Sequence, residues 1–481
     1  MSKLKNYLKE LEIWKQALWG IIIIGGPVIT TLLLIWLFSL HGTLGIFLWH
    51  PLFFSIIVIL GIFAVLGFSF ALLNIFLPNR RESKLFSILR KCSWIFCITC
   101  LITSVSFIGY VGPKLTHTAG STAPQILICD GEGENGIPKM AVTFWTERPT
   151  TNTLKWGNES LSKTITEEKA THQHAFILDK LNPDTEYWYQ INEEGEIYNF
   201  TTASEDNDKL RLAITSDAHF GRSESRPGIT RDILKEVTDP GNSFDSLFFL
   251  GDLVEYGFMD SQWKQFLDSV SPYTTRIPFR TLCGNHDTIF GGVKYYKDYL
   301  YPEKMPTDTG SRLYYRIDIN NVHIFALNLE WGLETYTAEQ KEWLESEIAK
   351  VEEDDWTIVM SHSFFYSSGS VYGFKSWADQ PDMLDAFEDL FIENDVDLVF
   401  SGHNHHVEVL EKEGIYYQIV GAAGAVPDPK ADTISDASEW YMNIETDSEF
   451  GFFEVDIDGN NATLNYRNKN YDSLYNITIE E

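Results

Sequence analysis

The chain has 481 residues, enough for roughly three domains of about 150 residues each, and is 44% hydrophobic and 22% charged, which excludes a disordered chain. Residues 1–112 carry nine basic and three acidic side chains, whereas residues 113–481 carry 28 basic and 65 acidic ones. So large a negative excess repels phosphate backbones, so we expect no nucleic-acid partner. The five cysteines give no disulfide framework, since three of them lie in an apolar stretch.

Three apolar stretches near the N-terminus are each about 20 residues or longer and contain no Asp, Glu, Lys or Arg, which predicts three transmembrane helices. They are Trp19–Leu40, Leu52–Leu77 and Ser93–Val111. A cleavable signal peptide is the alternative for the first, but its apolar run is too long. The prediction is a cytoplasmic N-terminus over 1–16, a membrane anchor over 17–112 and a linker over 113–123.

Basic residues fix the orientation of this anchor. Lysines precede the first stretch, none lies between the first and second, and lysines and arginines cluster between the second and third. Basic segments stay in the cytoplasm. We therefore expect a multi-pass protein of the cell membrane that contacts the lipid bilayer through three helices, with everything after about residue 112 on the extracytoplasmic side.

Residues 124–203 contain short alternating strands separated by turn residues, a pattern typical of a two-sheet β-sandwich. The segment Leu181–Tyr187 resembles the tyrosine corner of fibronectin type III modules. His172 and His174 stand two residues apart, and we interpret them as residues on a strand surface rather than as metal ligands, because no third ligand lies near them in sequence.

From residue 204 onward, apolar strands alternate with helical patterns, and polar motifs follow directly after five of the strands. Open α/β sheets place their ligands at such strand ends. The motifs are Asp217-x-His219, Gly251-Asp252, Gly284-Asn285-His286-Asp287, His362 and Gly402-His403-x-His405. A single strand histidine such as His323 is instead expected to be a core residue with its polar atoms satisfied.

These residue types suit a site for two metal ions. Carboxylate, imidazole and amide groups give mixed nitrogen and oxygen ligation of the kind that Zn, Mn or Fe accepts, and one aspartate that reaches both ions would bridge them. In extended backbone, residues two apart point to the same side, so Asp217-x-His219 and His403-x-His405 would each offer two ligands.

The five motifs together resemble the signature of the calcineurin-like metallophosphoesterases over about 210–458, and the preceding sandwich is similar in layout to the purple acid phosphatase branch. The resemblance covers about 124–458 and leaves the membrane segment outside it. The predicted fold class is multi-domain: the three transmembrane helices read from the apolar stretches, then, as the resemblance implies, an all-β fibronectin-like sandwich over 124–203 and an α/β metallophosphoesterase domain, an α/β/β/α sandwich, over 204–481. The resemblance also implies roles. Asp217, His219 and His405 would bind one metal, Asp252 would bridge, Asn285, His362 and His403 would bind the second, His286 would be the catalytic imidazole, and Asp287 would hold its orientation.

Two positions depart from the purple enzymes. His219 stands where they have glycine, and Glu255 stands where they have a metal-binding tyrosine, with Tyr256 one residue late. The hypothesis is therefore a non-purple enzyme whose two divalent or trivalent ions are Mn, Zn or a mixed pair with Fe.

The function implied is a membrane-anchored, extracytoplasmic phosphoesterase in which a hydroxide bridging the metals attacks the phosphorus. The alternative is a catalytically silent, membrane-tethered binding or receptor protein of the same fold. The substrate stays open between small-molecule phosphate esters and lipid or polymer esters, as does the oligomeric state. Arg222 and Arg226 could contact substrate, although we favour solvated loop charges, and we favour His406 pointing away from the site.

Overall fold

The computed structural model of the protein describes residues 120–204, 209–372 and 375–480, with the single positions 102, 106 and 109. Residues 117–481 form one compact unit. Its largest sheet runs in the order β22 (Ser473–Glu480), β21 (Asn461–Asn468), β20 (Gly451–Asp458), β8 (Lys209–Thr215), β9 (Ser246–Phe249), β10 (Phe279–Thr281), β1 (Gln125–Ile128), β2 (Met140–Thr150) and β5 (Thr171–Leu178).

A second large sheet packs against the first, and two smaller sheets complete the unit. The second runs in the order β11 (Tyr315–Ile319), β12 (Val322–Ala326), β13 (Trp356–Ser361), β16 (Leu398–Ser401), β18 (Ile415–Val420), β17 (Val407–Lys412) and β19 (Ser438–Met442). The smaller sheets are β4 (Lys163–Thr166), β3 (Thr153–Gly157), β6 (Glu186–Ile191) and β7 (Ile197–Thr201), and the pair β14 (Val371–Tyr372) and β15 (Lys375–Ser376).

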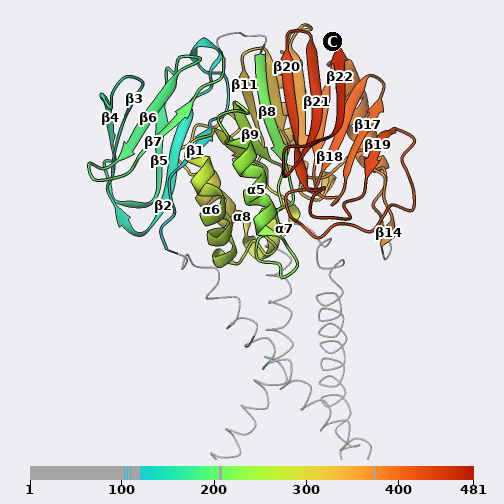
Figure 1. The fold of residues 1–481 in the computed structure, drawn as a ribbon, viewed down its shortest axis with the longest axis horizontal. Helices are drawn as coiled ribbons and strands as arrows, with labels where there is room; N and C mark the ends of the chain where they lie inside the picture. Colours follow the sequence, from blue (N-terminus) through green and yellow to red (C-terminus); the bar gives the residue numbers. More distant parts are fainter. Residues whose placement is uncertain are drawn as a thin grey trace, which may run out of the picture. The chain divides into compact units, whose positions relative to one another are not determined.

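Helices cover the outer faces of both large sheets. In Figure 1, α5 (Pro227–Val237) and α6 (Asp260–Thr274) lie in front of β8 and β9, near α8 (Val293–Leu300) and the short α7 (Asn285–Thr288). On the second sheet, Val359 of β13 packs in one cluster with residues of α9 (Ala338–Ile348) and α10 (Pro381–Glu393).

Strand periodicity divides the core between the two faces of the second sheet. Ile358 and Met360 of β13 share a buried cluster with Val455 of the first sheet, whereas Val359 between them points to the helices. This alternation is that of a strand buried on both faces. The result is helices, sheet, sheet and helices in layers, so the α/β part of the predicted fold class is supported.

Parallel strands bring their carboxyl ends to common sheet edges. β8, β9 and β10 are mutually parallel in the first sheet. In the second, β12, β13, β16 and β18 are parallel. The five predicted site motifs follow β8, β9, β10, β13 and β16, so the sheets place them at strand ends, as in other α/β folds.

The predicted sandwich shares a sheet with the α/β part. β1 pairs antiparallel with β2 and parallel with β10, where Leu127 lies opposite Phe279. At this junction Arg280 is 1% exposed, donates from Nη2 to Asp130 Oδ1 at 2.9 Å and stacks between the rings of Tyr301 and Tyr315. The predicted boundary between 203 and 204 stays a prediction; it falls in the β7–β8 connection, of which 205–208 lie outside the described residues.

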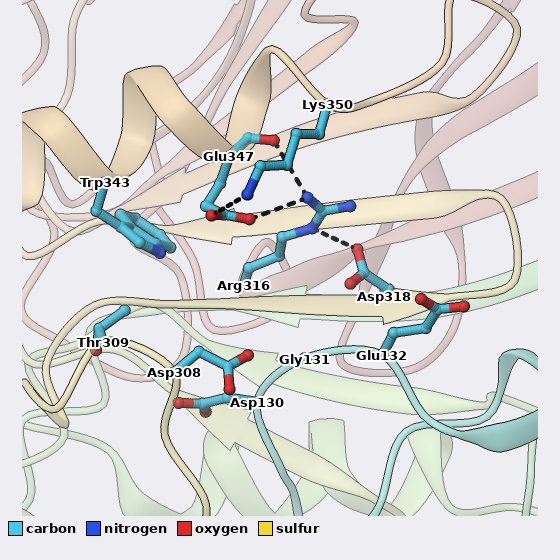
Figure 2. A pocket seen from close by; sticks show the side chains of 10 residues that line it. All are labelled: Asp130, Gly131, Glu132, Asp308, Thr309, Arg316, Asp318, Trp343, Glu347 and Lys350. Atoms are coloured by element: carbon cyan, nitrogen blue, oxygen red, sulfur yellow. Dashed lines mark hydrogen bonds and ion pairs between the residues drawn. The ribbon is translucent and has the colours of Figure 1, made fainter.

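A polar cavity of about 410 Å³ lies beside this junction, with Asp130, Arg316 and Glu347 in its lining (Figure 2). Arg316 donates to Asp318 Oδ1 at 2.7 Å and forms an ion pair with Glu347 at 3.6 Å. Among the described residues that line the cavity, none belongs to the nine predicted site residues.

The prediction of three transmembrane helices, and with it of bilayer contact through them, is wrong for the described structure. Across 120–204, 209–372 and 375–480, no helix is both long and apolar enough to cross a membrane. The longest there, α6, has 15 residues, whereas a span needs about 20. The predicted spans, the N-terminus over 1–16 and most of the linker over 113–123 lie outside the described residues, apart from positions 102, 106 and 109 in the third span and the last four linker residues.

Two histidines outside the site have structural surroundings. His174, expected on a strand surface, is fully buried; its Nδ1 lies 2.9 Å from Glu167 Oε2 and its Nε2 lies 2.8 Å from Thr146 Oγ1. The prediction was wrong for this residue because Glu167 and the Phe144 ring, stacked at 4.4 Å, cover that face of β5. His323 has both ring nitrogens satisfied, by Asp318 at 2.5 Å and Asp355 at 3.1 Å.

Candidate metal centre

The backbone turns sharply at several of the predicted ligands. Asp217, His219, Asp252 and His403 have φ angles of 62°, 46°, 50° and 70°. Left-handed backbone is uncommon for non-glycine residues and collects at functional sites. The expectation of extended backbone at Asp217-x-His219 and His403-x-His405 was therefore wrong: β8 ends at Thr215 and β16 at Ser401, and turns beyond the strands aim the side chains.

Glycines in the motifs allow the loops to approach closely. A Cβ atom on Gly402 would lie 2.1 Å from Ser216 Oγ and 2.6 Å from Asp217 Oδ2, and one on Gly284 would lie 2.2 Å from the backbone nitrogen of Asp252. Any side chain at either position would push the loops apart. Gly284 and Gly402 are thus packing requirements of the site.

One group of candidate ligands consists of Asp217, His219 and His405, whose ligating atoms all lie within 4.8 Å of one another. His405 Nε2 lies 3.3 Å and His219 Nε2 lies 3.6 Å from Asp217 Oδ1. The other carboxylate oxygen of Asp217 accepts a hydrogen bond from the backbone nitrogen of His403 at 3.0 Å. Loops after β8 and β16 therefore converge on one point.

A second group consists of Asp252, His362 and His403, and Asp252 connects it to the first. Asp252 Oδ2 lies 3.3 Å from His219 Nε2, while Oδ1 lies 3.4 Å from His362 Nε2. Asn285 Oδ1 lies 2.9 Å from both His362 Nε2 and His403 Nδ1. The two carboxylate oxygens of Asp252 thus face different groups, which is the geometry of a bridging ligand.

Hydrogen bonds behind the cluster show that these residues fit metal ions. His362 Nδ1 donates to the Leu250 carbonyl at 2.8 Å, His405 Nδ1 to the Val426 carbonyl at 2.7 Å, and His219 Nδ1 to Glu255 Oε2 at 2.8 Å. Because those partners only accept, the proton of each neutral ring sits on Nδ1, and Nε2 turns a lone pair toward the carboxylates. Outer partners of this kind orient metal-binding histidines.

Two buried acceptor atoms inside the cluster also indicate that the site fits a metal ion. Asp217 Oδ1 and His219 Nε2 are buried, and neither has a hydrogen-bond partner among the described residues. Buried polar atoms without partners are costly, and a cation placed between a carboxylate oxygen and an imidazole lone pair would satisfy both. The donor set of oxygen and nitrogen atoms matches Zn, Mn or Fe and contains no thiolate.

The carboxylates and imidazoles of the cluster shift one another's pKa values strongly. Burial alone would raise the pKa of Asp252, but His362 and His286 outweigh it and hold the pKa well below its usual range. Burial alone would likewise lower the pKa of His362, yet Asp252 and Asp217 raise it to about 9. The carboxylates thus stay ionised and attract positive charge to this point.

His286 belongs to a third group, with His219 and Asp252, whose ligating atoms also lie within 4.8 Å of one another. Its ring centroid is 4.6 Å from that of His219, and its Nδ1 donates to the Glu255 carbonyl at 2.8 Å. Asp287 does not hold this ring: its carboxylate accepts from the backbone nitrogens of Val254 at 3.1 Å and Gly284 at 3.0 Å. The expected orienting role of Asp287 is therefore corrected, since it fixes the loop backbone and the Glu255 carbonyl holds the imidazole.

The prediction did not include several residues that contact the candidate ligands. Glu255, noticed only for its unusual position, binds His219, and Asp428 Oδ2 accepts from the backbone nitrogen of His405 at 2.7 Å. The rings of Trp331 and Trp377 lie 5.0 and 4.9 Å from that of His403. The sequence offers no local signal for Asp428 or the two tryptophans, because the contacts join segments far apart in the chain.

The residues left open by the sequence also have defined partners. The Arg222 guanidinium lies 3.9 Å from Glu255 Oε2 and 3.7 Å from Glu224. Arg226 pairs with Asp447 at 2.9 Å. His406 is buried, and its Nε2 lies 3.1 Å from Glu408 Oε2, so hydrogen bonding within β17 accounts for it.

Comparisons with known proteins agree with this geometry. Residues 210–407 match the family model of the calcineurin-like phosphoesterases. Purple acid phosphatase 18 of Arabidopsis thaliana is 24% identical over 337 residues, which cover 65% of this chain and 73% of the relative. Probable inactive purple acid phosphatase 24 of the same plant is 22% identical over 343 residues, covering 60% and 54%. The chain therefore spans about half to three quarters of the length of these relatives.

A solved structure shows the same fold. Purple acid phosphatase PPD1 from yellow lupin (Lupinus luteus) superposes with a TM-score of 0.62 at 18% sequence identity, over 75% of this chain and 74% of that one. The likeness extends beyond the 198 residues between 210 and 407 that match the family model, because three quarters of the chain takes part.

Residues 210–407 therefore match a calcineurin-like phosphoesterase domain, and the predicted enzyme class, a metallophosphoesterase, is confirmed. Within that class its similarity is to purple acid phosphatases, which use a dinuclear metal centre. The predicted pair of metal ions is confirmed in the same way, since the described Asp and His side chains form groups that could hold such ions.

Proposed function

We propose that the protein hydrolyses phosphate esters with two metal ions held at the strand ends described above. The observation that carries the proposal is the position of Asp252, whose carboxylate oxygens face His219 on one side and His362 on the other. In this arrangement Asp217, His219 and His405 would hold one ion, Asn285, His362 and His403 would hold the second, and Asp252 would serve both.

The ions, when bound, supply charge for the phosphoryl oxygens and lower the pKa of water toward neutrality. The chain supplies the geometry. The Leu250 and Val426 carbonyls hold the rings of His362 and His405, so their Nε2 atoms need no reorientation. His286 Nδ1 donates a hydrogen bond to the Glu255 carbonyl, which leaves Nε2 to exchange a proton with the leaving oxygen. A positioned imidazole of this kind is typically worth about 10²–10⁴-fold in rate.

The test is hydrolysis of p-nitrophenyl phosphate by the full-length chain, measured after chelation and again after Mn²⁺, Zn²⁺ or Fe is added back. We expect activity that disappears with chelation and returns with metal, and a His286→Ala variant that keeps its metal but turns over slowly. No hydrolysis of any mono- or diester at full metal occupancy would refute the proposal.

That last result would instead favour the alternative, a silent binding protein. One relative is named as probably inactive, so the question is a real one for this fold. The complete set of seven candidate ligands in this chain supports the enzyme, because a centre that no longer binds metal would not need them.

The identity of the metals is also a proposal. Glu255 stands where a purple enzyme has its tyrosine and binds His219. We therefore propose a colourless centre with Mn, Zn or a mixed Fe pair. A strong visible absorption band of the metal-loaded protein that vanishes in Tyr256→Phe would contradict this.

Two further statements belong to the proposal. We propose that β1–β7 form a fibronectin type III-like module, supported by the backbone nitrogen of Asn182, which donates to the Tyr187 hydroxyl at 2.9 Å in the manner of a tyrosine corner. We also propose that catalysis takes place on the extracytoplasmic side of the cell membrane; the support comes from the sequence alone, in which 1–112 carries a net positive charge and 113–481 a large acidic excess. Digestion of the catalytic domain by protease added to intact cells would support that location, and full protection would contradict it.

A further inference from the structure

Aromatic side chains surround one candidate ligand far more than the others. The Trp377 ring lies 4.9 Å from the His403 ring at 38°, and the Trp331 ring lies 5.0 Å from it at 86°. The two tryptophans meet edge to face, with centroids 6.1 Å apart at 85°. His403 is thus flanked by two large rings that come from separate segments of the chain.

The two tryptophans differ in exposure. Trp331 is only 9% exposed, whereas Trp377 and His403 are both partly exposed. Trp331 therefore supports the arrangement from within, whereas Trp377 is a partly exposed aromatic residue beside a candidate ligand. Accessible aromatic surface next to a reaction centre is a contact for the part of a substrate that extends away from the phosphate.

Hydrogen bonds fix Trp377 relative to the metal ligands. Asn404, between the two ligand histidines of its motif, donates from Nδ2 to the Trp377 carbonyl at 2.9 Å and to Ser367 Oγ at 2.8 Å. The Trp377 backbone nitrogen donates to the Ser370 carbonyl at 3.1 Å. The backbone that carries Trp377 is thus tied directly to the loop that carries His403, so little ordering is needed when a substrate binds.

We propose that Trp377, backed by Trp331, is a specificity-determining platform on which an aromatic leaving group of the phosphate ester stacks. The inference rests on the proposed function and specifies its substrate class: esters of phosphate with an aromatic or heteroaromatic group, in preference to small aliphatic ones. In this proposal the phosphate lies at the metal ligands, and the flat leaving group lies beside His403, whose ring is 4.9 Å from that of Trp377. No step of the reaction itself is assigned to either tryptophan.

The test compares benzyl phosphate with ethyl phosphate on the metal-loaded, full-length chain. Both are primary alkyl esters with leaving groups of similar basicity, so the ring is the main difference between them. An aromatic contact is worth about 2- to 10-fold. In Trp377→Ala we expect kcat/KM for benzyl phosphate to fall by about that factor while the value for ethyl phosphate changes little, and we expect Trp377→Phe to recover most of the loss.

The matched control is Trp440→Ala. Trp440 is also partly exposed and stacked on an aromatic ring, that of Tyr475 at 4.7 Å, but it lies on β19. In Trp440→Ala we expect the ratio of kcat/KM for benzyl phosphate to kcat/KM for ethyl phosphate to stay at its wild-type value. Equal losses for both esters in Trp377→Ala would overturn the proposal, because that pattern means that Trp377 only holds His403 in place.

A binding measurement separates failure of this inference from failure of the proposed function. Benzylphosphonate and ethylphosphonate cannot be hydrolysed, and calorimetry gives their affinities for the metal-loaded chain. A chain that turns over no ester yet binds benzylphosphonate more tightly, with the difference lost in Trp377→Ala, would support the platform and refute the enzyme. Equal affinities for the two phosphonates would overturn the platform whatever the activity.

Discussion

Replacing Glu255 by glutamine should weaken binding of the ion at Asp217, His219 and His405. Glu255 Oε2 accepts a hydrogen bond from His219 Nδ1 at 2.8 Å, and both side chains are buried. Burial alone would raise the pKa of Glu255, but His219 and His286 lower it to about 2, so the acceptor is a full carboxylate. Glutamine has nearly the same size as glutamate but lacks the negative charge. That charge fixes the His219 ring and raises the basicity of its Nε2.

The size of the effect follows from that one contact. A hydrogen bond to a charged group contributes about 1.5–3 kcal/mol, which corresponds to about 10- to 150-fold in affinity. Loss of an outer partner of a metal-bound histidine typically costs about 10- to 100-fold, in the same range. We therefore expect the dissociation constant of this ion to rise by about 10- to 100-fold, measured by competition with a chelator of known affinity.

The chain offers a matched control for this variant. Glu167 is a second buried carboxylate that accepts from a buried imidazole, His174, at 2.9 Å, but it lies in the connection between β4 and β5. Glu167→Gln should leave both metal affinities unchanged. If Glu255→Gln also binds two ions with the affinity of the wild type, the role assigned to Glu255 is refuted.

Three further outcomes follow from the structure. Asp252→Asn should lower the rate of aryl phosphate hydrolysis by more than about 100-fold, because Asp252 contacts both groups of candidate ligands and its removal should cost more activity than removal of an outer hydrogen-bond partner. Near-normal rates would count against a bridging role of Asp252. Asp130→Ala should lower the free energy of unfolding by about 3–5 kcal/mol in urea titrations, because Arg280 stays buried without its ion-pair partner. A smaller loss of unfolding free energy in the Asp130→Ala, Arg280→Met double variant would confirm that cause. Burial raises the pKa of Asp245 to about 6. The folded state therefore holds that proton more tightly than the unfolded state, and the associated stability is lost as pH rises from about 4 to about 6. Asp245→Asn should accordingly gain stability over the wild type across that interval in urea midpoints, and a constant difference would contradict the assignment.

Much of the α/β architecture could be predicted because its strands are short apolar runs with polar motifs at their ends. The helical patterns expected between the strands after residue 204 include α9 and α10. α6 was not predicted, and it contains Pro272, a residue that usually argues against a helix. β22 was also missed: as an edge strand with mostly exposed side chains it carries a weak hydrophobic signal.

For the candidate site, the residue types in the sequence predicted which side chains would be ligands, but the sequence did not predict the local backbone geometry. Asp217 and His403 come close to their neighbours through left-handed turns, which no spacing rule for strands includes. The partners of the ligands were hidden for a different reason: Glu255 and Asp428 contact histidines 36 and 23 residues away in the chain. Such contacts depend on how the sheets bring the loops together and leave no periodic pattern in the sequence.

Anomalous diffraction from crystals of the full-length protein loaded with Mn²⁺ or Zn²⁺ tests the central claim most directly. We predict two peaks per chain, one bonded to Asp217, His219 and His405 and the other to Asn285, His362 and His403, with an oxygen of Asp252 bonded to each ion. A single peak, or two peaks of which Asp252 contacts at most one, would contradict the dinuclear centre.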